Sequence, residues 1–515
     1  MSAQASLPDR GRPRFLALER IVASGPFALL AVLVGGLSFG VFLWYAAVVR
    51  FGDVPGVSEG TLAVALVVGV LAVGTGWYAY GSYFARRAGI DVVTALRWDA
   101  PSWAAFALYG VGLVLPLTYG GQARAAAYAI AAFGLLKVLV AARFVPTVRD
   151  VFVTFVVTRL PIIVIAELAS VTIAQRPGEH VAESANPLLA VWGRWDAVHY
   201  LDIARRGYAG TDMAFFPLYP ALVHIVGAFV GNDLVAGLII SNVALFFGLL
   251  FFYKLVEHQY TRAVAHRAIF YISIFPTAIF FSAVYTESLF FALTVASFYY
   301  IREHRWIAAG IFGALAALTR SEGVILAVPF AMEVVSAARV GSLRAFLATP
   351  QRLVRIAIGA ALIPLGLASY MAWLWVLNGD PLYFSHVQTH WNRHFAPPWV
   401  AFNHAFAVMS ASKSPLTIAN TSIEIGFTLL MIGVFFASVT RMRPSYSAYM
   451  ALSILIPMST ASLMSMPRFA LVLFPMFAVL AVWGGRSWVN NAIVAFSLPL
   501  LGLFTVLFAD WYWVA

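Results

Sequence analysis

Apolar stretches of about 20 residues recur along the chain from residue 21 almost to its last residues, with short polar segments between them. A helix rises about 1.5 Å per residue, so each stretch is long enough to cross a hydrocarbon core of roughly 30 Å. The pattern therefore predicts an all-α polytopic membrane protein with about 15 transmembrane helices. Their expected positions are 21–48, 61–84, 103–119, 122–142, 151–174, 233–256, 268–283, 285–301, 306–319, 323–338, 355–378, 422–440, 445–464, 468–485 and 489–509.

The apolar stretch 215–230 is the ambiguous element of this pattern. A crossing there would invert everything that follows and move about twelve basic residues to the outside, whereas cytoplasmic loops normally carry the excess of Lys and Arg. We therefore expect this stretch to be interfacial or re-entrant.

The basic residues orient the chain. With the N-terminus in the cytoplasm, roughly two thirds of the 33 Lys and Arg residues fall in the predicted inner segments. The run 21–48 is longer than the core of a signal peptide, so we interpret it as an uncleaved first span. Two long segments, about 175–232 and 379–421, then face outward. We expect the chemistry there, because irregular backbone cannot lie exposed to lipid.

Composition agrees with a membrane protein and narrows its chemistry. Hydrophobic residues make up 62% of the chain and charged residues 11%, against about 25% charged in soluble domains. The absence of cysteine excludes disulfides, thiolate metal ligands and cysteine nucleophiles. The net charge of +11 is scattered over the loops rather than gathered in a stripe, so no nucleic-acid partner is expected.

The first outer segment holds an exceptionally polar run, VWGRWDAVHYLDIARRGY at 191–208. In a helix, Asp196 and His199 would be neighbours three positions apart, as would His199 and Asp202. A carboxylate beside a histidine suits a general base that takes the proton of an acceptor hydroxyl, while arginines stabilise a departing phosphate. The alternative is an interfacial helix whose Trp, Arg and Asp side chains only anchor it at the headgroups.

This run, followed by AFFPLYP at 214–220, resembles the signature of PIG-V-type mannosyltransferases, which are integral membrane glycosyltransferases of the GT-C class. Order and spacing agree over roughly 151–485. The similarity continues in FPTAIFFSAVYTESLF at 275–290 and GALAALTRSEGV at 313–324, and is weaker in HVQTHWNRHFAPPW at 386–399 and SMPRFALVLFP at 465–475.

The resemblance implies a GT-C-like fold and transfer of a hexose, mannose in this family, from a polyprenyl- or dolichyl-phosphate donor. Asp196 matches the family's catalytic aspartate by its position in the motif. GT-C enzymes mostly act without a metal, so neither a metal nor a cofactor is expected beyond the lipid-phosphate sugar donor as co-substrate. Eukaryotic members act on the GPI-anchor precursor, but the residues leave open whether the acceptor is carried by a lipid or a protein.

The resemblance also divides the chain into three expected parts. Residues 1–20 would be a cytoplasmic tail, and 21–150 a membrane extension of four helices that departs from the family pattern. Residues 151–515 would form the GT-C-like domain, whose large first outer loop carries the catalytic site. The extension is a place where a small membrane subunit could dock.

Further candidate residues lie at predicted outer ends of spans or in the second outer segment. Glu287, Arg320 and Glu322 fall on the same side as Asp196, although charged groups there can also snorkel to the headgroups. Arg468 could hold a donor phosphate bidentately or only mark the start of a helix. The expected site comprises Asp196 and His199 as catalytic residues and Arg194, Trp195, Asp202, Glu287, Arg320, Glu322, Gln388, Arg393, His394 and Arg468 as substrate contacts.

Three histidines spaced four apart, at 386, 390 and 394, would align along one face of a helix and suggest zinc. No acidic residue accompanies them in that register, and two prolines follow at once. We therefore expect no metal there and interpret Gln388, Arg393 and His394 as phosphate or sugar contacts.

Charges within the predicted spans suggest structural roles. Arg159 and Glu167 are eight residues apart on one helical face, which predicts an ion pair. Lys137 is expected to snorkel from an inner boundary.

A lipid or glycolipid flippase is the main rival interpretation, since such charges could line a path. The polar residues instead concentrate in outer segments, which favours an enzyme acting at the extracytoplasmic surface. That surface would be the outer face of the plasma membrane in a prokaryote and the lumenal face of the endoplasmic reticulum in a eukaryote. The expected partners are membrane lipids, the polyprenyl-phosphate donor and a lipid- or protein-linked acceptor.

Overall fold

The computed structural model describes residues 59–113, 133–143, 145–177, 183–340 and 349–514. These residues form helices connected by turns, and no strand occurs among them. The predicted first span, 21–48, lies outside the described residues. The chain divides into two compact units, Met1–Asp150 with Phe229–Gly231, and Val151–Ala228 with Asn232–Ala515.

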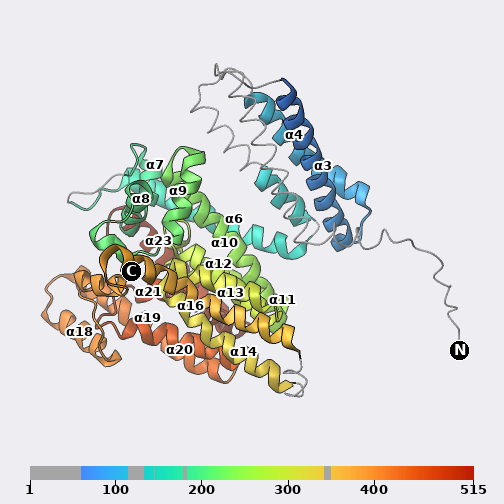
Figure 1. Ribbon diagram of the computed structural model, residues 1–515. Coiled ribbons are helices and arrows are strands. Elements are labelled where there is room, and N and C mark those ends of the chain that lie inside the picture. Colours follow the sequence, from blue (N-terminus) through green and yellow to red (C-terminus); the bar gives the residue numbers. More distant parts are fainter. Residues whose placement is uncertain (1–58, 114–132, 144, 178–182, 341–348, 515) are drawn as a thin grey trace. The chain divides into compact units, whose positions relative to one another are not determined.

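Figure 1 labels most of the helices along the chain. The α-helices are α3 (Glu59–Ala88), α4 (Val92–Leu113), α6 (Pro146–Thr172), α7 (Pro187–Ala190), α8 (Asp196–Arg206), α9 (Leu218–Val230), α10 (Asp233–Gln259), α11 (Arg262–Ser273), α12 (Glu287–Arg302), α13 (Trp306–Thr319), α14 (Ala327–Val340), α16 (Pro350–Asn378), α17 (Tyr383–His386), α18 (Pro398–Ala411), α19 (Pro415–Val439), α20 (Pro444–Met458), α21 (Met466–Val472), α22 (Phe474–Trp483) and α23 (Ser487–Ala509). Short 3-10 helices are η1 (Val191–Gly193), η2 (Gly210–Ala214), η3 (Ala278–Phe281), η4 (Ser321–Leu326) and η5 (Val387–Trp391).

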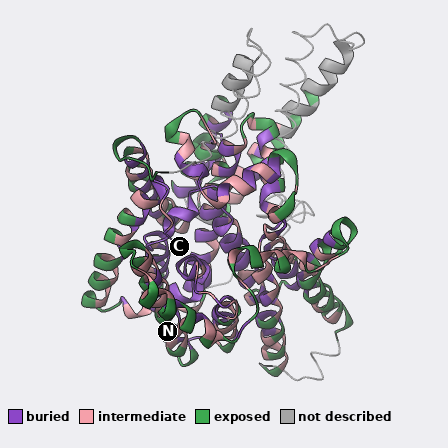
Figure 2. Ribbon diagram, turned by 90° about the vertical axis from the view of Figure 1, so that its left-hand side faces the viewer, coloured by how far each residue is buried: buried purple, intermediate pink, exposed green. Residues whose placement is uncertain are grey.

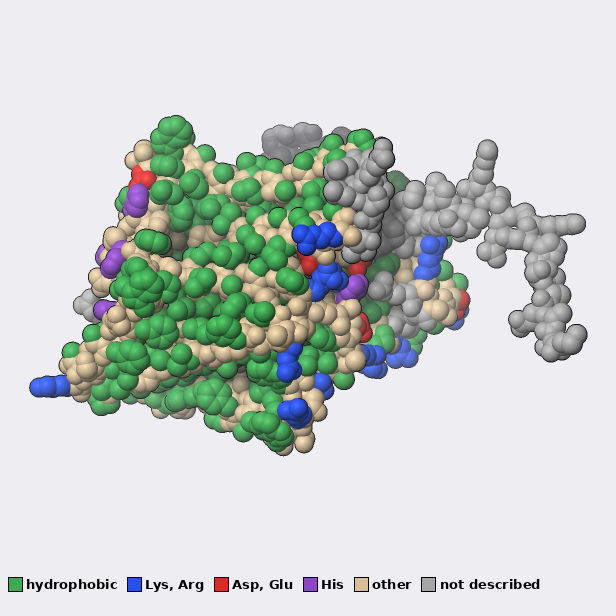
Figure 3. All heavy atoms as spheres, turned by 90° about the horizontal axis from the view of Figure 1, so that it is seen from below, with side chains coloured by type: hydrophobic (Ala, Val, Ile, Leu, Met, Phe, Trp, Pro, Cys, Tyr) green, Lys and Arg blue, Asp and Glu red, His purple; other side chains and the backbone are tan. Residues whose placement is uncertain are grey.

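Six helical segments among the described residues are long and apolar enough to cross a membrane, which makes the chain a polytopic membrane protein. They are α6, α10, η4 with α14, α16, α19 and α23. The expected total of about 15 spans stays a prediction. Figure 3 shows one face of the molecule, most of which is covered by hydrophobic side chains, while the visible charged and histidine side chains lie toward its edges.

Two of the predicted spans are broken rather than continuous. In place of the span 268–283, α11 ends at Ser273, and Pro276 and the short η3 separate it from α12. In place of 468–485, α21 and α22 meet at a bend of 75°. Proline causes such breaks because it lacks a backbone N–H and disfavours helical conformation in the residue before it. Apolar length alone could not reveal them.

Arg159, on α6, stabilises the first of these breaks. Its side chain is buried, and Nη1 donates to the carbonyl of Ala278 at 2.8 Å. Nη2 donates to the carbonyl of Ser273, the last residue of α11. The expected ion pair of Arg159 with Glu167 is therefore wrong: the guanidinium satisfies carbonyls that the interrupted helix leaves without partners.

The N-terminal unit contains α3, α4 and a helical segment at 133–143. Lys137 is buried there and forms an ion pair with Asp99. Its ammonium group also lies 4.4 Å from the ring centroids of Tyr80 and Trp103. The expectation that Lys137 snorkels to the membrane boundary is wrong, because a buried carboxylate and aromatic faces compensate its charge.

In the second unit, α13 and α16 pack backbone against backbone. A Cβ atom at Gly310 would lie 2.4 Å from the carbonyl oxygen of Gly359, and one at Gly366 would lie 2.3 Å from that of Ala314. Only glycine permits this approach. The contact fixes the end of α13, where the chain turns into η4 at Arg320.

The core of the second unit consists mainly of aromatic and aliphatic side chains of α10, α11, α12, α20, α21 and α22. Figure 2 shows these buried residues surrounded by exposed ones. Glu333, on α14, accepts hydrogen bonds from Arg302 at the end of α12 and from Arg443 and Ser445 at the start of α20. These bonds tie α12, α14 and α20 together. The opposite end of α12 starts with Glu287, the centre of a second charged cluster.

Candidate active site

A strained turn places Asp196 at the start of α8. Trp195, the residue before it, has φ 58° and ψ −123°, a conformation that favours glycine. The backbone N–H of Asp196 donates to the hydroxyl of Tyr285 at 3.2 Å, and that hydroxyl donates to the carbonyl of Arg194 at 3.1 Å. Tyr285 is fully buried, so a side chain of the core clamps the backbone on both sides of Trp195.

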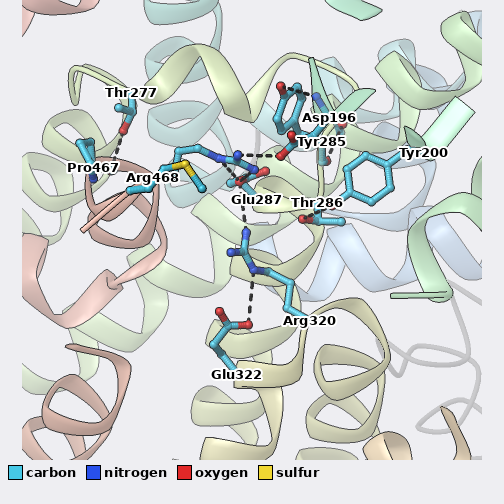
Figure 4. Close-up of polar contacts among 12 residues, drawn as sticks. Asp196, Tyr200, Thr277, Tyr285, Thr286, Glu287, Arg320, Glu322, Pro467 and Arg468 are labelled. Carbon is cyan, nitrogen blue, oxygen red and sulfur yellow. Dashed lines mark hydrogen bonds and ion pairs between the residues drawn. The ribbon is translucent and has the colours of Figure 1, made fainter. Parts of the chain in front are cut away.

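Arg468, in the first turn of α21, joins two carboxylates (Figure 4). Its Nη1 donates to Asp196 Oδ2 at 2.7 Å, while Nε and Nη2 donate to Glu287 Oε1 at 2.9 and 2.7 Å. The start of α21 is held in turn by Thr277, whose hydroxyl donates to the carbonyl of Pro467 at 3.0 Å. Three segments far apart in sequence thus meet at one guanidinium.

Glu287 is the buried centre of the cluster. Its Oε1 also accepts from Arg320 Nη1 at 3.1 Å, and its Oε2 is buried without a hydrogen-bond partner among the described residues. Arg320 in turn lies 3.7 Å from Glu322, measured from Nε to Oε2. A buried carboxylate persists only where cations compensate the loss of hydration, so Glu287 depends on Arg320 and Arg468 for its charge.

Exposure separates the roles of the two acids. The Asp196 side chain is 27% exposed, whereas that of Glu287 is 0% exposed and that of Arg468 is 7% exposed. Asp196 is therefore the carboxylate that an incoming hydroxyl can reach. Glu287 is not accessible from the surface, and its contacts are with Arg320 and Arg468, which it holds in place.

Tryptophans border the charged cluster. The Trp195 ring lies 5.7 Å from the ring of Trp511 and 5.3 Å from that of Trp513, between centroids. The Arg468 guanidinium lies 5.9 Å from the Trp513 centroid. The segment 510–514, after α23, thereby adjoins both Arg468 and the turn before Asp196.

The expected pairing of His199 with Asp196 is wrong. His199 Nδ1 lies 2.9 Å from Asp212 Oδ1, and its ring stacks on Phe215 at 4.6 Å. Residues three apart on a helix share a face, but His199 turns toward η2 because a carboxylate and an aromatic face are available there. Its side chain remains 37% exposed, so it can still contact a substrate.

Arg194 and Asp202 lie away from the cluster. Arg194 is buried with its guanidinium 5.3 Å from the Trp511 ring. Burial lowers the pKa of Arg194 to about 10, and the charge of nearby Asp510 opposes the shift. Asp202 lies 3.4 Å from Arg206 one turn further along α8, and its side chain is 41% exposed, as expected of a helix surface.

The segment 379–421 contributes Arg393 to the neighbourhood of the cluster. Its Nη2 donates to the carbonyl of Met464 at 2.8 Å, just before α21. Burial lowers the pKa of Arg393, as does the positive charge of Arg468, while Asp196 and Glu322 act in the opposite direction. Arg393 is thus a third arginine whose charge is felt near Asp196 and Glu322.

The three histidines at 386, 390 and 394 do not share one helical face. The helix is interrupted at Asn392, which has φ 56°, and His386 lies 2.7 Å from Asp380. The hydrogen bonds of the charged cluster involve neither Gln388 nor His394. Their roles as phosphate or sugar contacts therefore stay predictions.

A pocket adjoins the cluster between α12, η4, α20 and α21. Arg320 and Glu322 line it together with Phe290, Tyr449, Ser453, Phe469, Val472 and Leu473. The ion network therefore borders a small space inside the helical bundle through Arg320 and Glu322 and reaches the protein surface at Asp196.

Several residues of this site were missed by the sequence analysis. Tyr285 lies inside a motif that carries the resemblance, AVYTES, so its position was a signal that went unused. Asp212 has no such signal, because it is separated from His199 by a turn whose course the sequence does not define. The tryptophans of 510–514 follow the last predicted span, and nothing in the sequence relates them to residue 195.

These features define an integral membrane protein with a partly open carboxylate held by buried arginines. Residues 134–368 match the family model described as mannosyltransferase (PIG-V). The predicted resemblance is thereby confirmed. The matched segment includes Asp196, Glu287, Arg320 and Glu322 and is similar to that of mannosyltransferases.

One curated relative extends this result. GPI mannosyltransferase 2 of Schizosaccharomyces pombe (strain 972 / ATCC 24843) is 27% identical over 248 residues, which cover 43% of this chain and 52% of the relative. The chain thus spans about half the length of the curated relative that it matches. Arg393 and Arg468 lie beyond the family match, and it is the fold that brings them to the motif residues.

Proposed function

We propose that the protein transfers a mannosyl group from a polyprenyl-phosphate donor to the hydroxyl of a lipid- or protein-linked acceptor at the extracytoplasmic face. The family match supports the sugar. The observation that carries the proposal is the double contact of Arg468, which places one guanidinium between a partly exposed carboxylate and a fully buried one. A surface anchor would not require such a buried counter-charge.

In the proposed reaction, Asp196 is the general base. Its Oδ2 is engaged by Arg468, and Oδ1 takes the proton of the acceptor hydroxyl. The hydroxyl oxygen bonds to the anomeric carbon of mannose as the bond from that carbon to the donor phosphate oxygen breaks. The bonding electrons leave with the polyprenyl phosphate, and attack from the opposite side inverts the anomeric centre.

The arginines stabilise the charge that develops on the departing phosphate. Arg320, Arg393 and Arg468 all interact electrostatically with the acids of the cluster, and N–H groups of guanidinium suit phosphate oxygens. His199, held by Asp212, would contact the acceptor rather than orient Asp196. Glu287 holds Arg320 and Arg468 in place before any substrate binds, and such preorganised donors stabilise a developing charge without a reorganisation cost.

The test is mannosyl transfer in membranes that contain the wild-type protein or Asp196→Asn at matched expression. Radiolabelled polyprenyl-phosphate mannose is the donor, and incorporation into lipid and protein fractions is measured. Asp196→Asn should lose roughly 100-fold or more of the rate, since general base catalysis contributes about 10²–10⁴-fold.

Asp380→Asn is the matched control, because Asp380 is a partly exposed carboxylate paired with His386 in the second outer segment. It should transfer at the wild-type rate. Full activity of Asp196→Asn would place the base elsewhere, and incorporation from polyprenyl-phosphate glucose instead of mannose would change the donor.

A further inference from the structure

The segment 510–514 adjoins the site, although the proposed reaction assigns it no role. Trp511 is buried, and Trp513 is partly buried next to both Trp195 and Arg468. Two hydrogen bonds fix the segment from other elements: Asn420 Nδ2 donates to the carbonyl of Trp513 at 3.3 Å, and the N–H of Arg176 donates to that of Asp510 at 2.9 Å.

Trp195 is the residue on which this segment acts. Its φ of 58° is uncommon for a residue with a large side chain and must be held by its surroundings. Tyr285 holds the backbone on either side, but the Trp195 ring is held by the rings of Trp511 and Trp513. A change in this ring cluster would let the turn relax, and Asp196 is the next residue.

A second contact links the segment to the same turn. Arg194 and Asp510 are both buried and of opposite charge, but no hydrogen bond or ion pair joins their side chains among the described residues. Arg194 also lies over the Trp511 ring at 5.3 Å. Both residues that precede Asp196 thus rest on 510–514.

We infer that Trp513, with Trp511, is a positioning residue: the segment 510–514 holds Trp195 in its strained conformation and thereby sets the place of the Asp196 carboxylate beside Arg468. The inference rests on the proposed function only where it refers to catalysis. The positioning of the turn itself is a structural property that can be measured without any substrate.

The experiment combines kinetics with a spin label. Trp513→Ala should lower kcat about tenfold or more with KM for the lipid donor changed less than about twofold, because a small misplacement of a reacting group reduces the rate without removing binding contacts. Trp513→Phe, which keeps an aromatic ring, should restore most of the rate. In a Trp195→Gly background, Trp513→Ala should add little further loss, since the two changes interrupt one contact.

The label reports the turn independently of activity. The chain has no cysteine, so a nitroxide on Arg206→Cys, whose parent side chain is 78% exposed at the end of α8, gives a specific signal. Trp513→Ala should shift its spectrum toward the mobile component. Trp488→Ala, which removes a 68% exposed tryptophan from α23, is the control and should leave both the spectrum and kcat unchanged.

If Trp513→Ala does not yield folded protein, Asn420→Ala provides the same test by removing the hydrogen bond to the Trp513 carbonyl. Wild-type kcat and an unchanged spectrum in these variants would overturn the inference, as would equal effects of Trp488→Ala. A wild-type protein that transfers no sugar, or an active Asp196→Asn, would overturn the proposed function instead, while the label spectra would still decide on the positioning.

Discussion

Glu287 illustrates how a single buried residue organises the site. Its carboxylate accepts hydrogen bonds from two arginines on different elements and is fully buried. Removing one member of a buried ion pair leaves an uncompensated charge, which costs roughly 3–5 kcal/mol. The arginines at 320 and 468 would then turn toward Asp196 and Glu322, and the geometry of the site would change.

Glu287→Gln is accordingly expected to reduce both transfer and thermal stability. The midpoint of thermal unfolding in detergent should fall, and transfer from the labelled donor should drop by at least about tenfold. Glu257→Gln, which changes an exposed carboxylate on α10, should alter neither. A Glu287→Gln protein with wild-type stability would contradict the interpretation of Glu287 as the compensating charge.

At the scale of single residues, the sequence allowed the residues of the site to be selected more reliably than their partners could be predicted. Asp196 could be selected because it lies in the polar motif of the first outer segment. Glu287, Arg320 and Arg468 could be selected because each is a charged residue in a motif at a predicted outer end of a span. The partner of His199 could not be predicted, since helical spacing gives the face of a side chain but not the loop that covers it. Asp212 decided that orientation.

At the scale of elements, the interrupted helices explain how charged groups reach the interior. The break between α11 and α12 sets Glu287 at a helix start, and the bend between α21 and α22 leaves Arg468 in a short helix. A continuous helix in place of the first break would satisfy its own backbone and leave no reason for Arg159 to be buried there. Hydropathy could predict the spans but not these breaks, because both halves are equally apolar.

Substitutions at Arg159 and Glu167 test whether Arg159, on α6, stabilises the break after α11 or pairs with Glu167. The contacts of Arg159 with the carbonyls of Ser273 and Ala278 predict that Arg159→Met lowers the thermal midpoint and increases proteolysis near Pro276. Glu167→Gln should have no effect on either measurement. Equal destabilisation by the two variants would instead support the predicted ion pair between Arg159 and Glu167.

On the scale of the whole molecule, two charged clusters lie at the two ends of α12. Glu287 begins this helix and Arg302 ends it, and 16 residues span about 24 Å at 1.5 Å per residue. That separation approaches the thickness of a hydrocarbon core. We therefore expect the cluster around Glu287 on the outer side and the one around Glu333 on the inner side.

Cysteine accessibility tests this orientation. Ala185→Cys, before α7, and Glu303→Cys, after α12, are both exposed positions in a chain without other cysteines. In intact cells or sealed vesicles, a membrane-impermeant maleimide should label residue 185 from the outside and residue 303 only after permeabilisation. Labelling of both from the same side would contradict this orientation of α12, and protection of residue 185 in intact cells would exclude an active site on the extracytoplasmic face.

The direct contact between α13 and α16 limits how this protein can diverge. A methyl group at Gly310 would meet the backbone of the neighbouring helix rather than a side chain that could rotate away. A smaller side chain elsewhere could therefore not relieve this clash. Arg320, at the end of α13, takes its position from that contact. In a library of random variants, Gly310 and Gly359 should tolerate as little change as the charged residues of the site, although neither belongs to that site. Selection for activity would therefore detect changes in helix spacing as sharply as changes in the reacting groups.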